Sequence, residues 1–185
     1  MTYQIPDTVN YKGETYKTYS DPFVQYRYKF DRKQRPQFEM TSTANWHGYL
    51  ADYEIKEDKL FMINFEGNLC LEIDKCYKDV GLDYFFPNQK EQFADWFTGG
   101  LHLWTDEQQR SRAELRGSYN EDELYLEFKD GILVNSFKIP AKVISIITNL
   151  ETKLHFYEHP PQRWTVFYGI GHRFFPRLFK NWENR

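Results

Sequence analysis

The chain has 185 residues, a formal net charge of -3 at pH 7 and a mean hydropathy of -0.76. A chain of this length can bury a sizeable core, and its mildly acidic balance argues against generic nucleic-acid binding. The two cysteines make no disulfide scaffold and match no zinc spacing, so we expect neither a metal nor a cofactor. The sequence shows no signal-peptide pattern and no apolar run long enough to span a bilayer, which predicts a cytoplasmic protein without a membrane partner.

Aromatic residues make up 19% of the chain, and many alternate with polar residues, as is typical of half-buried antiparallel strands. Near the N-terminus, residues 11–16 contain Gly13 and are expected to turn a hairpin. Residues 23–30 are expected to form a strand because every second side chain is apolar: Val24, Tyr26, Tyr28 and Phe30. A polar, solvent-exposed loop at residues 31–36 follows that strand.

Three segments in the middle of the chain alternate in the same way, at residues 46–55, 60–65 and 69–73. Polar or glycine-containing turns separate them at residues 56–59 and 66–68. Strands joined by such short turns pair with each other, so the sequence predicts a three-stranded meander. Tyr49, Ala51, Tyr53 and Ile55 are expected on one face of the first strand, and Phe61, Ile63 and Phe65 on one face of the second.

Residues 93–104 are expected to form a further strand, with a bulge or a close backbone approach at Gly99 and Gly100. Thr105 and Gln108 have the spacing of a capping box, which predicts a short helix that ends near Arg116.

Alternating residues on both sides of Asp130-Gly131 predict a hairpin over residues 124–139. Residues 143–150 fit either a helix or a buried strand. These elements predict one domain over residues 1–185, mostly β, of α+β or all-β class. We expect a strongly curved antiparallel sheet or partial barrel with one to three short helices, and residues 163–185 packed on it or extending from it.

Four segments carry a resemblance to a known family: Thr41-Ser-Thr-Ala-Asn-Trp-His-Gly-Tyr49, Tyr53-Glu-Ile-Lys-Glu-Asp-Lys-Leu-Phe61, Phe93-Ala-Asp-Trp-Phe-Thr-Gly99 and Leu126-Glu-Phe-Lys-Asp-Gly-Ile-Leu-Val134. They resemble segments of uncharacterised bacterial proteins, a family without an assigned activity. The resemblance therefore implies no catalytic residue. In size and composition alone, the chain is similar to immunity proteins of bacterial toxin systems.

The segment His155-Phe-Tyr-Glu-His159 matches an inverted zinc-protease pattern, in which two histidines hold zinc and the glutamate acts as a base. That pattern requires a helix. Pro160 follows at once, and a residue before proline is biased away from helical geometry. We therefore expect an extended segment with exposed histidines and no metal site.

Two residues are weak candidates for catalysis. His47 is a candidate general base because histidine in general titrates near neutrality, and Asp95 lies in a ring-rich segment where the pKa of a carboxyl can rise. Structural roles stay open for both: a hydrogen bond within the sheet for His47, and turn capping or an Arg partner for Asp95. The candidate binding residues near them in sequence are Trp46, Tyr49, Tyr53 and Trp96.

The segment 163–185 interleaves aromatic rings with five cations and one acid, a local balance of +4. Three interpretations stay open for it. Its rings can cover the core while its cations pair with acids, it can bind a protein, or it can contact single-stranded nucleic acid. The candidate binding residues here are Trp164, Arg173, Arg177 and Trp182.

The sequence favours a non-catalytic cytoplasmic protein that binds another protein, such as an immunity-type protein that neutralises a bacterial partner. The first alternative is an enzyme or small-ligand binder that uses a ring-lined, concave face of the sheet. The second alternative is contact with single-stranded nucleic acid through the C-terminal segment, although nucleic acid is the less expected partner.

Overall fold

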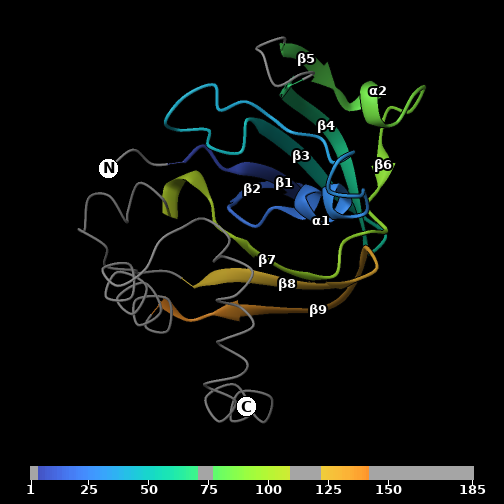
Figure 1. Cartoon of the computed structure of the whole chain (residues 1–185). Coiled ribbons are helices and arrows are strands. Elements are labelled where there is room, and N and C mark those ends of the chain that lie inside the picture. The colour runs from blue at the N-terminus through green and yellow to red at the C-terminus, as the bar shows by residue number, and fades with distance from the viewer. Residues whose placement is uncertain (1–3, 71–76, 109–121, 142–185) are drawn as a thin grey trace. The chain divides into compact units, whose positions relative to one another are not determined.

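The computed structural model describes residues 4–70, 77–108 and 122–141, and Figure 1 draws the rest of the chain as a grey trace. The chain divides into two compact units, Met1–Ala141 and Lys142–Arg185. Every element described below belongs to the first unit. The expectations for residues 143–150, for the histidine pair at 155–159 and for the segment 163–185 therefore lie outside the described residues.

The described part is mostly β, with a nine-stranded mixed sheet and three short helices (Figure 1). The strands are β1 (Asp7–Tyr11), β2 (Glu14–Thr18), β3 (Tyr49–Lys56), β4 (Lys59–Cys70), β5 (Tyr77–Gly81), β6 (Gln92–Phe93), β7 (Gly99–Leu103), β8 (Glu123–Lys129) and β9 (Ile132–Ile139). The named helices are α1 (Pro22–Tyr28) and α2 (Leu82–Phe85), and a further helical segment starts at Asp106.

The strand order is β2-β1-β3-β4-β9-β8-β7, with β5 and β6 paired to β4 outside this path. Neighbours are antiparallel except β1 and β3, which run parallel. The expected strong curvature is wrong, because the sheet is neither closed nor strongly curled. Among the described residues, β4 and β9 share one residue pair, Lys59 with Ile132, and β2 meets the chain after β7 at one bridge, Lys17 with Trp104.

Three tight turns follow the sequence expectation. They join β1 to β2, β3 to β4 and β8 to β9, and both central residues of each have positive φ: Lys12-Gly13, Glu57-Asp58 and Asp130-Gly131. Such turns match the natural twist of paired strands. The predicted capping box is also confirmed. The Gln108 amide N–H donates to the Thr105 hydroxyl at 3.2 Å, and the Thr105 amide N–H donates to the Gln108 side-chain oxygen at 2.8 Å.

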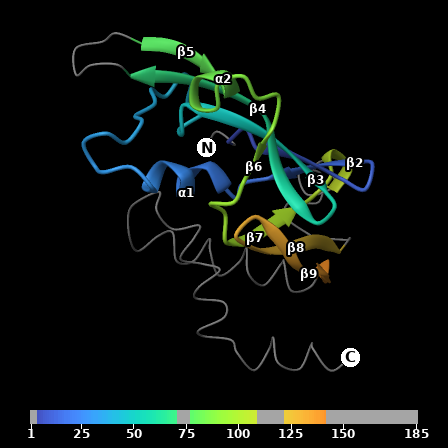
Figure 2. The same cartoon turned by 90° about the vertical axis from the view of Figure 1, so that its right-hand side faces the viewer.

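The expected strand at residues 23–30 is wrong, because its first six residues belong to helix α1. Asp21 is the N-cap, and its side chain accepts a hydrogen bond from the Val24 amide at 3.1 Å. Pro22 occupies the first turn, where its missing amide hydrogen costs nothing. Figure 2 shows α1 and, in blue, the long connection that leads from it toward β3.

The meander is also corrected at residues 66–68, which form no turn but continue β4. Gly67 lies inside that strand because the rings of Phe38 and Phe65 cover its backbone. A Cβ atom at this position would lie 2.9 Å from both rings. The strand that follows β4 in the chain is β5, and it pairs antiparallel with residues 66–70 of β4.

Residues 93–104 contain two strands rather than one interrupted strand. β6 ends at Phe93, and β7 begins with Gly99 and Gly100. Helix α2 lies between β5 and β6 and was not expected from the sequence.

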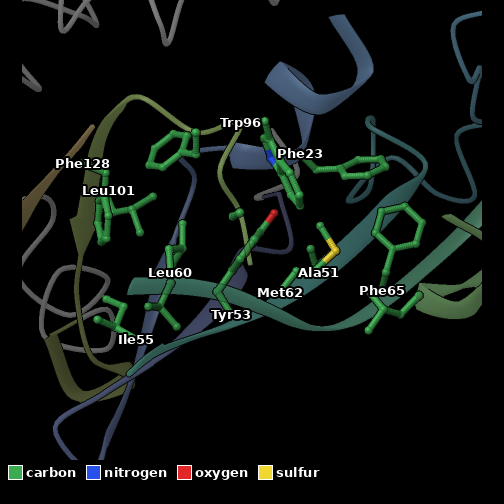
Figure 3. Close-up of a cluster of buried hydrophobic side chains, with 14 of the residues drawn as sticks. Phe23, Ala51, Tyr53, Ile55, Leu60, Met62, Phe65, Trp96, Leu101 and Phe128 are labelled. Carbon is green, nitrogen blue, oxygen red and sulfur yellow. The ribbon is translucent and has the colours of Figure 1, made fainter. Parts of the chain in front are cut away.

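The core is built from α1 and from the inward faces of β1, β3, β4, β7 and β8 (Figure 3). As expected, Tyr49, Ala51, Tyr53 and Ile55 are all buried on one face of β3. In β4 the buried residues are Leu60, Met62, Phe65 and Leu69, so the expectation that Phe61, Ile63 and Phe65 share one face is wrong. A register shift in the pairing of β3 with β4, between Asp52 and Tyr53, explains why Phe65 faces inward although Phe61 does not.

No helix in the described part of the chain is long and apolar enough to cross a membrane.

Candidate binding surface

The connection between α1 and β3 is fixed to the sheet at residues 37–48, named here the 37–48 loop. Backbone hydrogen bonds join it to β4 at three places. The Cys70 amide donates to the Gln37 carbonyl at 2.8 Å, the Glu39 amide donates to the Asn68 carbonyl at 2.9 Å, and the Asn68 amide donates to the Gly48 carbonyl at 3.0 Å. Both ends of the loop are therefore held by one strand.

The outer part of the 37–48 loop folds back on itself and is joined to the N-terminal residues. Ser42 and Asn45 form an isolated bridge. The Ile5 amide donates to the Ala44 carbonyl at 2.7 Å, and the Trp46 amide donates to the Gln4 side-chain oxygen at 3.0 Å. Two chain segments far apart in sequence thus support one another at this point.

This construction leaves three large apolar side chains at the surface. Ile5 is 49% exposed, Met40 is 50% exposed and Trp46 is 58% exposed. We name these three residues the exposed apolar surface, because Met40 and Trp46 belong to the 37–48 loop and hydrogen bonds tie that loop to Gln4 and Ile5. Trp and Met are enriched where proteins bind one another, and a backbone that is already fixed loses little conformational freedom on binding.

His47 lies next to Trp46 and contacts the carboxylate that caps α1. Its Nδ1 is 3.4 Å from Oδ2 of Asp21, and its side chain is 49% exposed. The same Asp21 oxygen accepts a hydrogen bond from the Tyr49 hydroxyl, whose ring centroid is 5.8 Å from that of His47. A histidine beside a carboxylate is an arrangement that enzymes use for proton transfer. A proton acceptor by itself defines no reaction.

Asp7 lies close to two other aspartates, Asp21 and Asp52. Asp7 accepts a hydrogen bond from the Ala51 amide at 2.9 Å, and Asp52 accepts hydrogen bonds from the side chains of Thr8 and Asn64. Burial raises the pKa of Asp7 well above its usual value, and the charges of Asp21 and Asp52 raise it further, against the hydrogen bond from Ala51. The fold therefore disfavours the charged form of Asp7.

Two candidate ring residues belong to the core beneath α1. Tyr49 is 3% exposed and Tyr53 is fully buried. Burial raises the pKa of both hydroxyls well above the usual value, with Asp21 adding to the effect at each. Figure 3 shows the Tyr53 ring rising from β3 with its oxygen directed toward Trp96 and Phe23.

Trp96 packs against α1, and Asp95 lies near the C-terminal end of that helix. The Trp96 ring is 8% exposed, its Nε1 donates to the Pro22 carbonyl at 3.1 Å, and it stacks on Phe86 with ring centroids 5.5 Å apart. The Asp95 side chain is 60% exposed and pairs with Lys29 at 3.4 Å. The structure thus places Trp46 and His47 on the 37–48 loop, whereas Asp95 and the buried Trp96 belong to the segment between β6 and β7.

The remaining candidates, Trp164, Arg173, Arg177 and Trp182, lie outside the described residues, as does the histidine pattern at 155–159. Within the described part, no group of three or more His, Cys, Asp or Glu side chains is placed to hold a metal ion.

Sequence reasoning missed three residues that build this region. Asp21 could have been found, because Asp followed by Pro is a common start of a helix. Ile5 and Met40 gave no signal, since an isolated apolar residue in a polar stretch does not reveal whether it faces solvent.

Comparisons with family models, curated proteins and solved structures find no match to this chain.

Proposed function

We propose that this protein is a non-catalytic binding module that holds another protein through the exposed apolar surface of Ile5, Met40 and Trp46. The main observation in support is that these three side chains are exposed to solvent. The backbone that carries them is held by hydrogen bonds to β4 and between the loop and the N-terminal segment. Leaving them in water costs free energy that burial against a partner would recover, at about 25 cal/mol per Å² of apolar area.

The chemistry of the surface fits a protein better than a small molecule. Small-molecule sites are concave and enclose most of their ligand. Here the rings of Tyr49, Tyr53 and Trp96 are used inside the core, while Trp46 and Met40 project outward. A projecting Trp is the kind of residue that fills a pocket on another protein. An immunity-type role, in which binding neutralises the partner, stays a prediction within this proposal.

One observation favours a second candidate, an enzyme or small-ligand binder. An exposed imidazole next to a largely buried carboxylate, as His47 and Asp21 are, is the arrangement that a general base uses. The two candidates differ in which side chain matters. A protein-binding module depends on Trp46 and Met40, whereas a general base depends on His47.

The test is affinity capture of the tagged full-length protein from its native host, with quantitative mass spectrometry. The variant is Met40→Ala combined with Trp46→Ala. The matched control is Ile132→Ala combined with Val134→Ala, which removes two exposed apolar side chains from β9, 47% and 57% exposed. Circular dichroism and urea unfolding check that each variant is folded.

We expect a stoichiometric partner that the unmodified protein and the control retain and that the Met40/Trp46 variant loses by at least about tenfold. Equal retention by variant and control would exclude this surface as the interface. If the unmodified, folded protein retains no reproducible partner, the proposal fails. A metabolite whose thermal-shift effect disappears in His47→Ala would then support the second candidate.

A further inference from the structure

A second surface on the first unit is strongly basic. Residues 27–36, named here the basic loop, contain five cations and one acid, a local balance of +4 in a chain whose net charge is -3. The rest of the chain is correspondingly acidic. Cations that gather on one loop of an acidic protein create a local positive field that attracts negative groups.

The fold holds this loop closed with one of its own cations. The Arg27 guanidinium donates two hydrogen bonds to the Pro36 carbonyl, at 3.1 and 3.0 Å, so the two ends of the loop meet. Within the loop, the Gln34 amide donates to the Asp31 carbonyl at 2.9 Å. Arg27 therefore has a structural role, and the loop is shaped before any partner arrives.

The other cations of the loop differ in exposure: Lys29 pairs with Asp95 at 3.4 Å, and Arg35 is half-buried, with its Nε shielded from solvent. Arg32 and Lys33 are exposed and form no ion pair with the described residues. The Arg35 guanidinium lies 4.0 Å from the centroid of the Tyr28 ring, which is 55% exposed. An Arg stacked on a Tyr is held in one orientation, and its planar fork matches a carboxylate in two parallel hydrogen bonds. None of these three cations is needed to close the loop.

We propose that the basic loop binds a carboxylate-rich segment of the partner protein, with Arg32, Lys33 and Arg35 pairing to its acidic side chains and Tyr28 packing beside them. The inference rests on the proposed function, because it names the chemistry of a second contact on the same partner. The basic loop would contact the acidic groups of the partner, whereas Ile5, Met40 and Trp46 would make the apolar contacts.

The alternative polyanion is single-stranded nucleic acid, which binds by stacking bases on rings and pairing phosphates with cations. Two observations favour the acidic protein segment. One face of Tyr28 is already covered by Arg35, which removes a stacking surface for a base. The whole chain has an isoelectric point of about 6.0, whereas a domain that binds nucleic acid is usually strongly basic.

Fluorescence anisotropy with the full-length protein tests the proposal. The probes are labelled oligoglutamate, labelled oligouridylate and labelled oligolysine. The variant is Arg32→Glu combined with Lys33→Glu. The matched control is Lys90→Glu combined with Lys129→Glu, which makes the same change in net charge at two exposed lysines elsewhere in the first unit.

We expect oligoglutamate to bind the unmodified protein and the control, with an affinity that falls as salt is added. The Arg32/Lys33 variant should bind it at least about tenfold more weakly, because two attractive charges become repulsive. Any of three results would overturn the inference. The unmodified protein does not bind oligoglutamate, the variant and the control lose affinity for it equally, or the unmodified protein binds oligouridylate more tightly than oligoglutamate. The result is independent of the capture experiment, in which the Met40/Trp46 variant alone decides the proposed function.

Discussion

The Tyr49 hydroxyl donates a hydrogen bond to the Asp21 carboxylate, which joins the first residue of β3 to the N-cap of α1 across 28 positions of sequence. One oxygen of Asp21 accepts this bond and lies 3.4 Å from His47, while the other accepts the Val24 amide of the helix. A single carboxylate therefore starts the helix, fixes the buried tyrosine and supports the loop that carries Trp46.

Replacing Asp21 should show how much the fold depends on that carboxylate. Asp21→Ala removes the helix cap and leaves the Tyr49 hydroxyl buried without this acceptor, so we expect a loss of about 3 kcal/mol in the free energy of unfolding. Asp21→Asn keeps an oxygen acceptor for Val24 and should lose less than half as much. Urea denaturation of both variants measures the difference. Equal losses would mean that hydrogen-bond acceptance is not what Asp21 contributes.

The raised pKa of Asp7 predicts how stability depends on pH. Between the ordinary carboxyl pKa and the raised value in the folded protein, the folded state binds more protons than the unfolded state. The free energy of unfolding should therefore fall as pH rises through that interval, and it should stay lower at neutral pH. This is the reverse of an ion-paired aspartate.

Asp7→Asn removes the ionisation and keeps an oxygen for the Ala51 amide. We expect the variant to be more stable than the unmodified protein at pH 7, with the difference shrinking as the medium becomes acidic. Urea denaturation across the acid-to-neutral range measures this. Asp95→Asn is the control, because Asp95 is exposed and pairs only at the surface. A variant less stable than the unmodified protein at pH 7 would contradict the assignment.

The parts of the fold that the sequence predicted correctly are those set by neighbouring residues. The turn at Asp130-Gly131 and the capping box of Thr105 and Gln108 depend on backbone angles and hydrogen bonds within a few positions. Local chemistry decides them, so a single sequence is sufficient.

The errors come from packing between distant residues. In α1 the ring of Phe23 packs on Tyr26, and Tyr26 packs on Phe30 just after the helix, but rings at every second position imitate a strand. Gly67 looks like a turn residue in the sequence, but it lies within β4. The ring of Phe38, distant in sequence, packs so closely over it that a Cβ atom would clash. Of the residues in the candidate region, Trp46 and His47 were named from the sequence. The other members of the region depend on contacts between the N-terminal segment and the 37–48 loop, which sequence spacing does not contain.

The turn between β8 and β9 should tolerate substitution less than the turn between β1 and β2. Gly131 and Gly13 both have positive φ, 75° and 84°. A Cβ at Gly131 would lie 2.5 Å from the Ala94 carbonyl oxygen, whereas a Cβ at Gly13 would meet no atom within 4 Å. Gly13→Ala should therefore cost about 1 kcal/mol from backbone strain alone, and Gly131→Ala should cost more than about 2 kcal/mol. Thermal unfolding of the two variants gives the comparison. Similar losses of stability would contradict the predicted clash at Gly131.

Two substitutions in and beside α1 distinguish the helix from the strand that the sequence suggested. A strand at residues 23–30 would turn Tyr28 inward with Val24 and Tyr26, and would turn Phe23 outward. In the helix, Phe23 is fully buried among rings of Tyr26, Tyr49 and Phe65, while Tyr28 is 55% exposed.

Phe23→Ala should therefore lower the free energy of unfolding by about 3 to 5 kcal/mol, the usual cost of removing a buried ring. Tyr28→Ala should lower it by less than about 1 kcal/mol, because the substitution removes an exposed side chain and its contact with Arg35. Urea denaturation with circular dichroism measures both. A large loss for Tyr28→Ala with a small loss for Phe23→Ala would instead support a strand at residues 23–30. Asp21 would then cap no helix, and its support of the loop that carries His47 and Trp46 would need another explanation.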